Sequence, residues 1–191
     1  MANVDRPNGF TPVKTRSGAP VTGLIRQVGV ADGADIFIGD ALTLSSGLAA
    51  ASTAAADTII GVAVGFGKKD PSSKQWTGAV NPNDQETQYY DDSANTHTDW
   101  AVFYVPAEDV IFEAQFDGTP TTPTVGQGYG LIYTTGSVVT GRSAQEIDGD
   151  DVTDIDVVVV ELPQAPRNDV TAAYGRVYVM FDDLVFVNLI S

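Results

Sequence analysis

Short apolar segments alternate with polar turns along most of the chain, and this pattern predicts strands rather than helices. The apolar segments are rich in β-branched and aromatic residues and end at glycine, proline, asparagine or aspartate, which is typical of strands joined by tight turns. The predicted strands are residues 24–30, 36–44, 58–66, 100–105, 110–116, 125–133, 137–140, 155–162, 174–181 and 184–190. Residues 45–48 predict a hairpin turn, and the alanine-rich residues 49–56 fit either a loop or a short helical turn.

About ten short strands at regular spacing predict an all-β chain with a single β-barrel or sandwich-like body. Two segments share one pattern, in which a Val-Gly or Ile-Gly pair precedes an apolar strand, a polar pair and a glycine. These segments are residues 38–47 and 125–136. The shared pattern predicts one strand–turn unit that is used twice in the barrel.

Residues 1–24 differ from the predicted body, residues 25–191, because three prolines alternate with three glycines there. Proline removes backbone donors and restricts the residue before it, so neither a helix nor a central strand fits. Apolar and basic side chains are interleaved within the same segment, namely Arg6, Phe10, Val13, Lys14, Arg16 and Val21. A flexible linker lacks such apolar residues, and we therefore predict an extended N-terminal arm that lies against a partner.

The charge distribution supports a partner for the N-terminal arm. The chain carries a net charge of −15, yet residues 1–30 hold four basic residues and one acidic residue, so the remainder carries −18. A strongly acidic surface disfavours nucleic acid and anionic membranes as partners. The basic end predicts contact with an acidic partner or with the body of a neighbouring copy, and a solvated tail is the alternative.

The most polar part of the middle of the chain is residues 67–98, which we interpret as a loop excursion from the body. Loops of this length inside a compact domain usually have a function. Three aromatic residues in this stretch, Trp76, Tyr89 and Tyr90, are candidates for contact with a partner, and burial in the core is the alternative for each. Trp100 begins a predicted core strand.

Candidate chemistry is sparse, and we predict neither an enzyme nor a bound metal or cofactor. The chain has no cysteine, and its one histidine, His97, lies in a polar loop without a nucleophile-elbow motif nearby. Residues 61–69 are glycine-rich but lack the spacing of a phosphate-binding loop. The acidic residues 148–156 fit either a solvated loop or a weak cation site. No signal peptide or membrane span is predicted.

Several short blocks resemble, in order along the chain, a family of small head proteins of tailed bacteriophages. The opening Arg6-Pro7-Asn8-Gly9-Phe10-Thr11-Pro12-Val13-Lys14, followed by Gly18-Ala19-Pro20, is similar to the start of these capsid decoration (cement) proteins. Residues 38–40, 60–65, 110–118 and 141–148 fit further blocks of that family, and Arg167-Asn168-Asp169 resembles a family turn but lacks its proline. Residues 67–98 and the C-terminal end diverge most.

The resemblance implies a β-barrel-like body with an N-terminal arm that binds the major capsid protein on the outer surface of the virion. It also implies symmetric clusters between capsomers, among which we favour a homotrimer. The expected function is structural, namely clamping neighbouring capsomers, with Arg6, Phe10, Val13, Lys14, Arg16 and Val21 as capsid-binding residues. Deletion of residues 2–20 is then expected to leave a folded body that no longer binds heads. The alternative is a carbohydrate- or receptor-binding module of a phage tail or fibre, with Trp76, Tyr89 and Tyr90 as stacking platforms.

Overall fold

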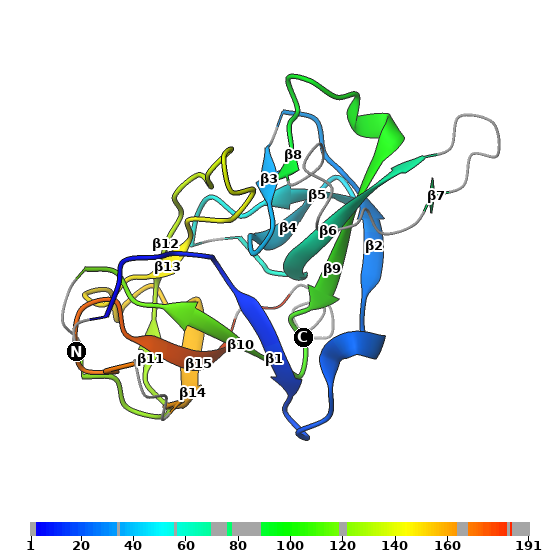
Figure 1. The fold of residues 1–191 in the computed structure, drawn as a ribbon. Coiled ribbons are helices and arrows are strands. Elements are labelled where there is room, and N and C mark those ends of the chain that lie inside the picture. Colours follow the sequence, from blue (N-terminus) through cyan, green and yellow to red (C-terminus); the bar gives the residue numbers. More distant parts are fainter. Residues whose placement is uncertain are drawn as a thin grey trace.

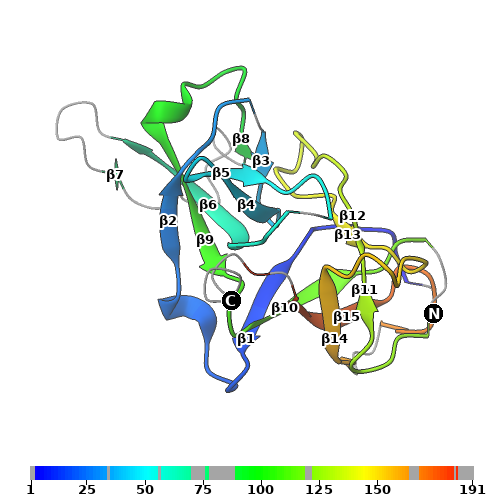
Figure 2. The same ribbon diagram turned by 180° about the vertical axis from the view of Figure 1, so that it is seen from behind.

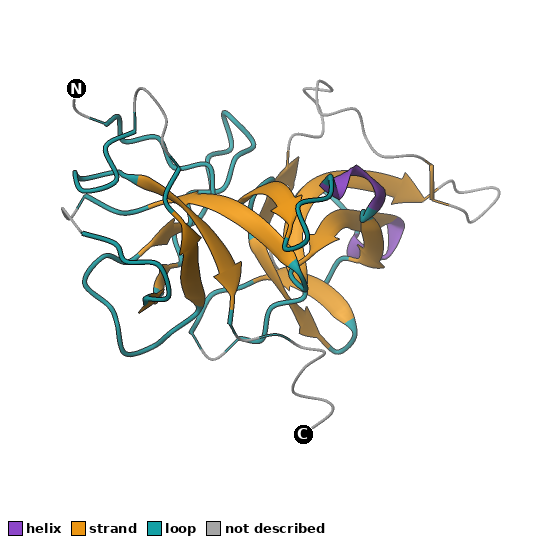
Figure 3. Cartoon of the chain, turned by 90° about the horizontal axis from the view of Figure 1, so that it is seen from below, coloured by secondary structure: helices purple, strands orange, loops and turns teal. Residues whose placement is uncertain are grey.

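The computed structural model describes residues 3–33, 35–55, 57–69, 76–77, 89–118, 122–163, 168–182 and 184. Within these ranges the chain is built from strands, with two short 3₁₀ turns, η1 (Val21–Gly23) and η3 (His97–Asp99), as its helical elements (Figure 3). The strands are β1 (Thr11–Thr15), β2 (Arg26–Gly29), β3 (Ile36–Phe37), β4 (Ala41–Ser45), β5 (Leu48–Ala51), β6 (Gly61–Lys69), β7 (Trp76–Thr77), β8 (Tyr89–Tyr90), β9 (Trp100–Pro106), β10 (Val110–Gln115), β11 (Gly128–Tyr129), β12 (Leu131–Ile132), β13 (Glu146–Ile147), β14 (Val157–Glu161) and β15 (Arg176–Phe181).

Most strands belong to two antiparallel sheets, which lie side by side (Figures 1 and 2). The first sheet has the order β2-β9-β6-β4-β5, with β7 paired to the end of β6, and the second has the order β1-β10-β15-β14-β11. Two small pairs, β3-β8 and β12-β13, complete the fold. The predicted all-β class is confirmed, but no closed barrel forms in the described part of the chain.

The two sheets are built to the same plan, because β2, β9, β6 and β4 correspond to β10, β15, β14 and β11. The β6–β9 pairing shifts register between Ala63 and Gly65, and the β14–β15 pairing shifts at the same point, between Val159 and Glu161. A β-bulge of this kind bends and twists a strand locally. An equal bulge at the equivalent place therefore gives both sheets a similar shape.

The segments that share a sequence pattern occupy equivalent places in this plan. The Gly39 N–H donates to the Ala63 carbonyl at 2.9 Å, and the Gly126 N–H donates to the Val159 carbonyl at 2.8 Å. A second hydrogen bond, 2.9 Å long in both sheets, joins the same segments in the opposite direction: the Ala63 N–H donates to the Asp40 carbonyl, and the Val159 N–H donates to the Gln127 carbonyl. The repeat is confirmed for the glycine turn and the strand that follows it, whereas the polar pair and glycine form a hairpin turn only in the first segment. The two units lie in two sheets and not in one barrel.

The correspondence extends to β2 in the first sheet and β10 in the second. Just after β2, Val30 forms a parallel bridge with Ala49, and just after β10, Phe116 forms the same bridge with Ile147. Arg26 pairs with Tyr104 of β9, and Phe112 pairs with Val179 of β15. Tyr104 and Val179 are equivalent, because each pairs with the residue at which the bulge of the next strand begins. Arg26 and Phe112 therefore occupy equivalent positions. Strand β2 is therefore the counterpart of β10.

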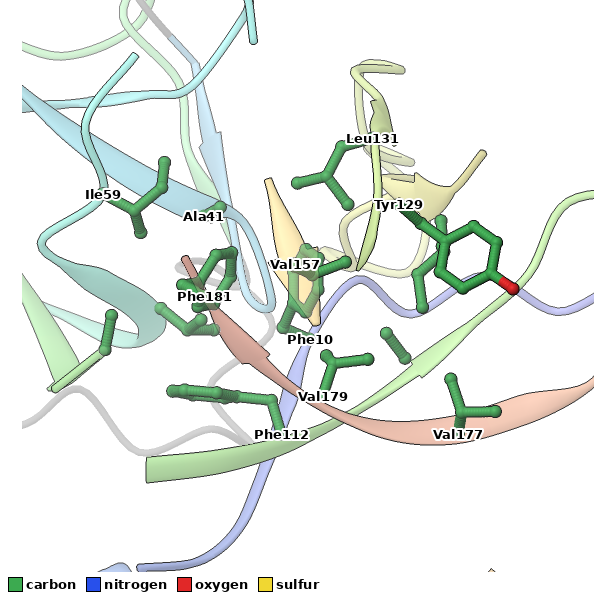
Figure 4. Close-up of a cluster of buried hydrophobic side chains, with 14 of the residues drawn as sticks. Phe10, Ala41, Ile59, Phe112, Tyr129, Leu131, Val157, Val177, Val179 and Phe181 are labelled. Carbon is green, nitrogen blue, oxygen red and sulfur yellow. The ribbon is translucent and has the colours of Figure 1, made fainter. Parts of the chain in front are cut away.

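The buried side chains form two clusters. One cluster lies within the first sheet and its β3-β8 cover, with Leu42, Phe66 and Tyr90 among its members. The larger cluster is built mainly on the second sheet but also contains Ala41 and Ile59 from the first half of the chain (Figure 4). The sheets therefore share a continuous core and make up one body.

Several local predictions change in the structure. Residues 49–51 continue strand β5 and are not helical, whereas residues 137–140 form a turn and not a strand. The predicted hairpin turn is confirmed, because Ser46 and Gly47 both have positive φ between β4 and β5. Of the predicted strand 184–190, all but Leu184 lies outside the described residues. No helix in the described ranges has the length and apolar character needed to cross a membrane.

Candidate functional site

The N-terminal arm lies on its own protein. Residues Thr11–Thr15 form β1, which pairs antiparallel with β10 from Thr11 opposite Glu113 to Thr15 opposite Val110. Pro12 fits there because β1 is an edge strand and needs no donor on its outer side. The segment is extended, and its place at the edge of the second sheet makes it part of the body.

Phe10 belongs to the core of the chain. Its side chain is 1% exposed and its ring lies 4.8 Å from that of Phe181, which in turn contacts Phe112 at 5.4 Å (Figure 4). A side chain buried in this way has no surface to offer to a capsid groove. The assignment of Phe10 as an anchor for a partner is therefore corrected.

Two glycines fix the point where the arm crosses the body. The Phe10 N–H donates to the Gly39 carbonyl at 2.9 Å, next to Gly9. Both glycines have positive φ, and a Cβ on either would meet the backbone of the other strand, at Gly39 O or at Asn8 O. Only glycine allows so close an approach in this conformation, so the sequence specifies this contact.

The other predicted arm residues divide into engaged and exposed side chains. Val21 packs against the main core cluster, and Val13 is half-buried. The Lys14 ammonium pairs with Glu161 at 2.6 Å, whereas the side chains of Arg6 and Arg16 belong to exposed residues. Deletion of residues 2–20 would remove the buried Phe10 side chain and the whole of β1, so we now expect it to destabilise the remaining body.

The exposed part of this region lies between β1 and β2, at the bottom of the view in Figure 1. Leu24 is 37% exposed and Ile25 is 52% exposed, and both precede the edge strand β2. Neither Arg16 nor Arg26 forms an ion pair with a described residue. We call residues 24–29 the β2 edge. The sequence predicted a strand here but not an exposed one.

The aromatic residues of the polar stretch are more buried than predicted. Tyr90 is 0% exposed and packs edge-on against Trp100, which is a core residue as expected. Tyr89 is half-buried, and its ring stacks on Phe37 at 4.8 Å. The Trp76 side chain lies outside the described residues. The assignment of Tyr90 to partner contact is therefore corrected.

Two buried carboxyl groups, Asp40 and Asp156, and the half-buried carboxyl of Glu146 have a raised pKa. Burial raises the pKa of Asp40 to about 6, although its Oδ2 accepts the Phe37 N–H at 2.7 Å. Burial likewise raises the pKa of Asp156 to about 6 and that of Glu146 to about 7. Each carboxyl accepts its own hydrogen bond. The three therefore act as separate structural groups.

The acidic loop at residues 148–156 satisfies its own backbone. Asp148 accepts the N–H groups of the second and third residues after it, and Asp151 does the same. These bonds, together with the Thr153 hydroxyl, lower the pKa of Asp151. No group of three or more His, Asp or Glu side chains that could hold a metal occurs in the described ranges.

A cavity of about 250 Å³ lies beside the Asp40 turn, with Asp35, Ser52, Tyr133 and Gln145 among its lining residues. Gln145 already donates to the Ser52 carbonyl at 3.0 Å and accepts the Ala41 N–H at 2.8 Å. The cavity walls are therefore largely engaged in holding the fold.

Comparison with protein-family models, with curated proteins and with solved structures finds no match to this chain. A functional interpretation therefore depends on its own residues and geometry. The feature that stands out is the β2 edge with Arg16.

Proposed function

We propose that this protein is a capsid decoration protein that binds the outer surface of a bacteriophage head and clamps neighbouring capsomers. The carrying observation is the exposed apolar and basic surface at the β2 edge, on a body that is otherwise strongly acidic. Arg26, next to exposed Leu24 and Ile25, and Arg16, in the loop that precedes them, form no ion pair with described residues, and such a surface suits an acidic, partly apolar protein partner. The resemblance of several sequence blocks, in order along the chain, to those of phage head proteins favours the same partner.

The mechanism follows from the energetics of a shell under outward pressure from packed DNA. A protein bound across a capsomer boundary adds contacts that must break before the subunits separate. The N-terminal arm is fixed to the body by the β1–β10 pairing, by the buried Phe10 and by the Gly9–Gly39 crossing. Arm and body therefore bind as one rigid unit. A rigid clamp loses little conformational entropy on binding. Cyclic association, with a trimer favoured, would multiply weak contacts through avidity.

The alternative, a carbohydrate- or receptor-binding module of a tail or fibre, depended on an exposed aromatic platform. Tyr90 is buried and Tyr89 is stacked on Phe37. Stacking on a sugar needs an accessible ring face, so two of the three residues chosen for this role are poorly placed for it.

Co-sedimentation with DNA-free heads tests the proposal. Heads of the phage that encodes the chain, assembled without it, are expected to bind it saturably and with symmetric occupancy. Binding should weaken as salt is raised, because the exposed arginines contribute screened charge interactions. Failure to bind heads at low salt, together with specific binding on a glycan array, would contradict the proposal and favour the alternative.

A further inference from the structure

The counterpart strands β2 and β10 differ in what lies at their outer edges. In the second sheet, β10 is covered by β1 along its outer side. In the first sheet, β2 is the terminal strand. Strand β5 reaches its outer side only at its end, where Val30 bridges Ala49 and the Ala31 N–H donates to the Ala49 carbonyl, and no described segment pairs with the outer side of residues 24–28. The same framework therefore has one edge closed by its own chain and one edge open.

The side chains before each strand show the same difference. Since Arg26 corresponds to Phe112, Leu24 and Ile25 correspond to Val110 and Ile111. Val110 is 0% exposed and Ile111 is 7% exposed, whereas Leu24 is 37% exposed and Ile25 is 52% exposed. An apolar pair at the same place is covered in one sheet and uncovered in the other.

The backbone of the β2 edge is oriented to accept a further strand. The Val30 N–H donates inward, to the Trp100 carbonyl, at 3.4 Å. Because N–H groups alternate sides along a strand, those of Ile25, Gln27 and Gly29 point outward. A row of outward N–H and C=O groups is a template for strand addition.

We propose that the β2 edge is the docking site for an extended, acidic segment of the coat protein, which adds to the first sheet as an antiparallel strand. This proposal rests on the proposed function and names the contact that carries it. Main-chain hydrogen bonds supply affinity, and contacts with Leu24 and Ile25 supply specificity. The geometry is that of β1 on β10, repeated between two molecules.

Charge selects this occupant over a second copy of the same edge. Arg16 and Arg26 form no ion pair with described residues, so carboxylates on the added strand would neutralise them. In a twofold β2–β2 pairing centred on Arg26, the two copies of this arginine would face each other, and like charges across strands are destabilising. An acidic segment of another protein fits the edge better.

Two substitutions at Gln27 isolate the contribution of main-chain hydrogen bonds to head binding. Gln27→Pro removes an outward N–H while leaving the β2–β9 bonds, and Gln27→Ala removes the side chain but keeps that N–H. We expect the alanine variant to bind DNA-free heads within about twofold of wild type, and the proline variant to bind about tenfold more weakly. Unchanged melting temperatures verify that both variants fold.

A second pair of variants tests the docking site without a proline, in case Gln27→Pro disturbs β2. Ile25→Glu places a carboxylate on the β2 edge, whereas Val139→Glu makes the same change on an 83% exposed residue outside it. The first is expected to weaken head binding about tenfold and the second to leave it unchanged.

The outcomes separate the two proposals. If wild type does not sediment with heads, the proposed function and this docking site both fail. If wild type binds and Gln27→Pro and Ile25→Glu bind equally well, the docking site alone is overturned. If these variants instead abolish self-association of the protein while head binding persists, the occupant is a second copy and not the coat protein.

Discussion

The outer edge of the second sheet and the outer edge of the first sheet are counterparts with opposite states. Strand β1 pairs with β10, whose Val110 and Ile111 are buried, whereas Leu24 and Ile25 at the uncovered β2 are exposed. The sheets share their bulge position, their glycine turns and their bridge pattern. The difference therefore arises from one added strand and not from a different framework.

This comparison changes the role of the N-terminal arm. Its apolar residue Phe10 and its strand β1 complete the protein's own core. The β2 edge carries residues of the same apolar and basic kind, and they are exposed in the described part of the chain, so this is the surface to which we assign the partner. The arm closes one edge, and the counterpart edge is the one at which we propose that another chain adds.

The largest expected effect comes from removing the side chain that anchors the closed edge. Phe10→Ala should lower the free energy of unfolding by about 3–5 kcal/mol, because it leaves a cavity against Phe181. Ile25→Ala, at the open edge, should change it by less than about 0.5 kcal/mol. Urea unfolding followed by tryptophan fluorescence measures both, and similar losses for the two variants would contradict the difference in burial.

A somewhat smaller effect concerns pH, at a position where the sheets differ. Asp40 follows Gly39 in the first sheet, and Gln127 follows Gly126 in the second. Burial raises the pKa of Asp40 from 3.8 to about 6, so the folded state binds the proton more tightly than the unfolded state. Its contribution to stability is therefore full below pH 4 and is lost as pH rises through about 6.

Asp40→Asn removes the titrating carboxyl and so tests whether Asp40 causes this pH dependence of stability. Between pH 4 and pH 8, wild type should lose up to about 3 kcal/mol more unfolding free energy than the asparagine variant. Urea unfolding across this pH range provides the measurement. Parallel stability curves for the two proteins would show that the Asp40 carboxyl has an ordinary pKa in the folded state.

Gly39 in the first sheet and Gly126 in the second occupy equivalent turns and provide the next comparison. Both have positive φ, but a Cβ at Gly39 would meet the backbone of Asn8, whereas a Cβ at Gly126 would meet nothing within 4 Å. Gly126→Ala should cost about 1 kcal/mol from conformation alone. Gly39→Ala should cost a further 1–3 kcal/mol, roughly the cost of overpacking. Thermal unfolding measures the difference, and equal costs would mean that the arm does not cross at Gly39.

The smallest effect concerns the ion pair at the closed edge. Lys14 and Glu161 are 2.6 Å apart, but both side chains are at least one-third exposed. A double-mutant cycle with alanine at each position should give a coupling of only about 0.2–1 kcal/mol, decreasing with salt. A salt-independent coupling well above this range would show that the pair, rather than the core, holds β1 in place.

Local pattern in the sequence predicted the long strands but not the assembly. Strand β9 begins at Trp100 and β10 at Val110, as their β-branched and aromatic runs indicated. The predicted strand 36–44 is divided into β3 and β4, while β8 lies in the predicted loop excursion and β13 was not predicted. The pairings of β3 with β8 and of β12 with β13 join residues that are distant in sequence, which no local pattern indicates. Closure into a barrel or division into two sheets is likewise set by long-range contacts.

The candidate site shows the same limit. The proline and glycine pattern of residues 1–24 correctly indicated an extended segment with apolar contacts. It could not indicate which surface Phe10 contacts, because Phe181 and Phe112 are distant in sequence. The exposure of Ile25 likewise depends on the absence of a covering strand among the described residues, which no local pattern encodes.

Amide hydrogen exchange on the free and the head-bound protein tests the central claim most directly. In the free protein, the outward N–H groups of Gln27 and Gly29 should exchange fast, while those of Ile111 and Glu113, beneath β1, should be protected. On heads, Gln27 and Gly29 should become protected as well. Protection of Gln27 and Gly29 in the free protein, or fast exchange there on fully occupied heads, would contradict the open edge and its role in binding.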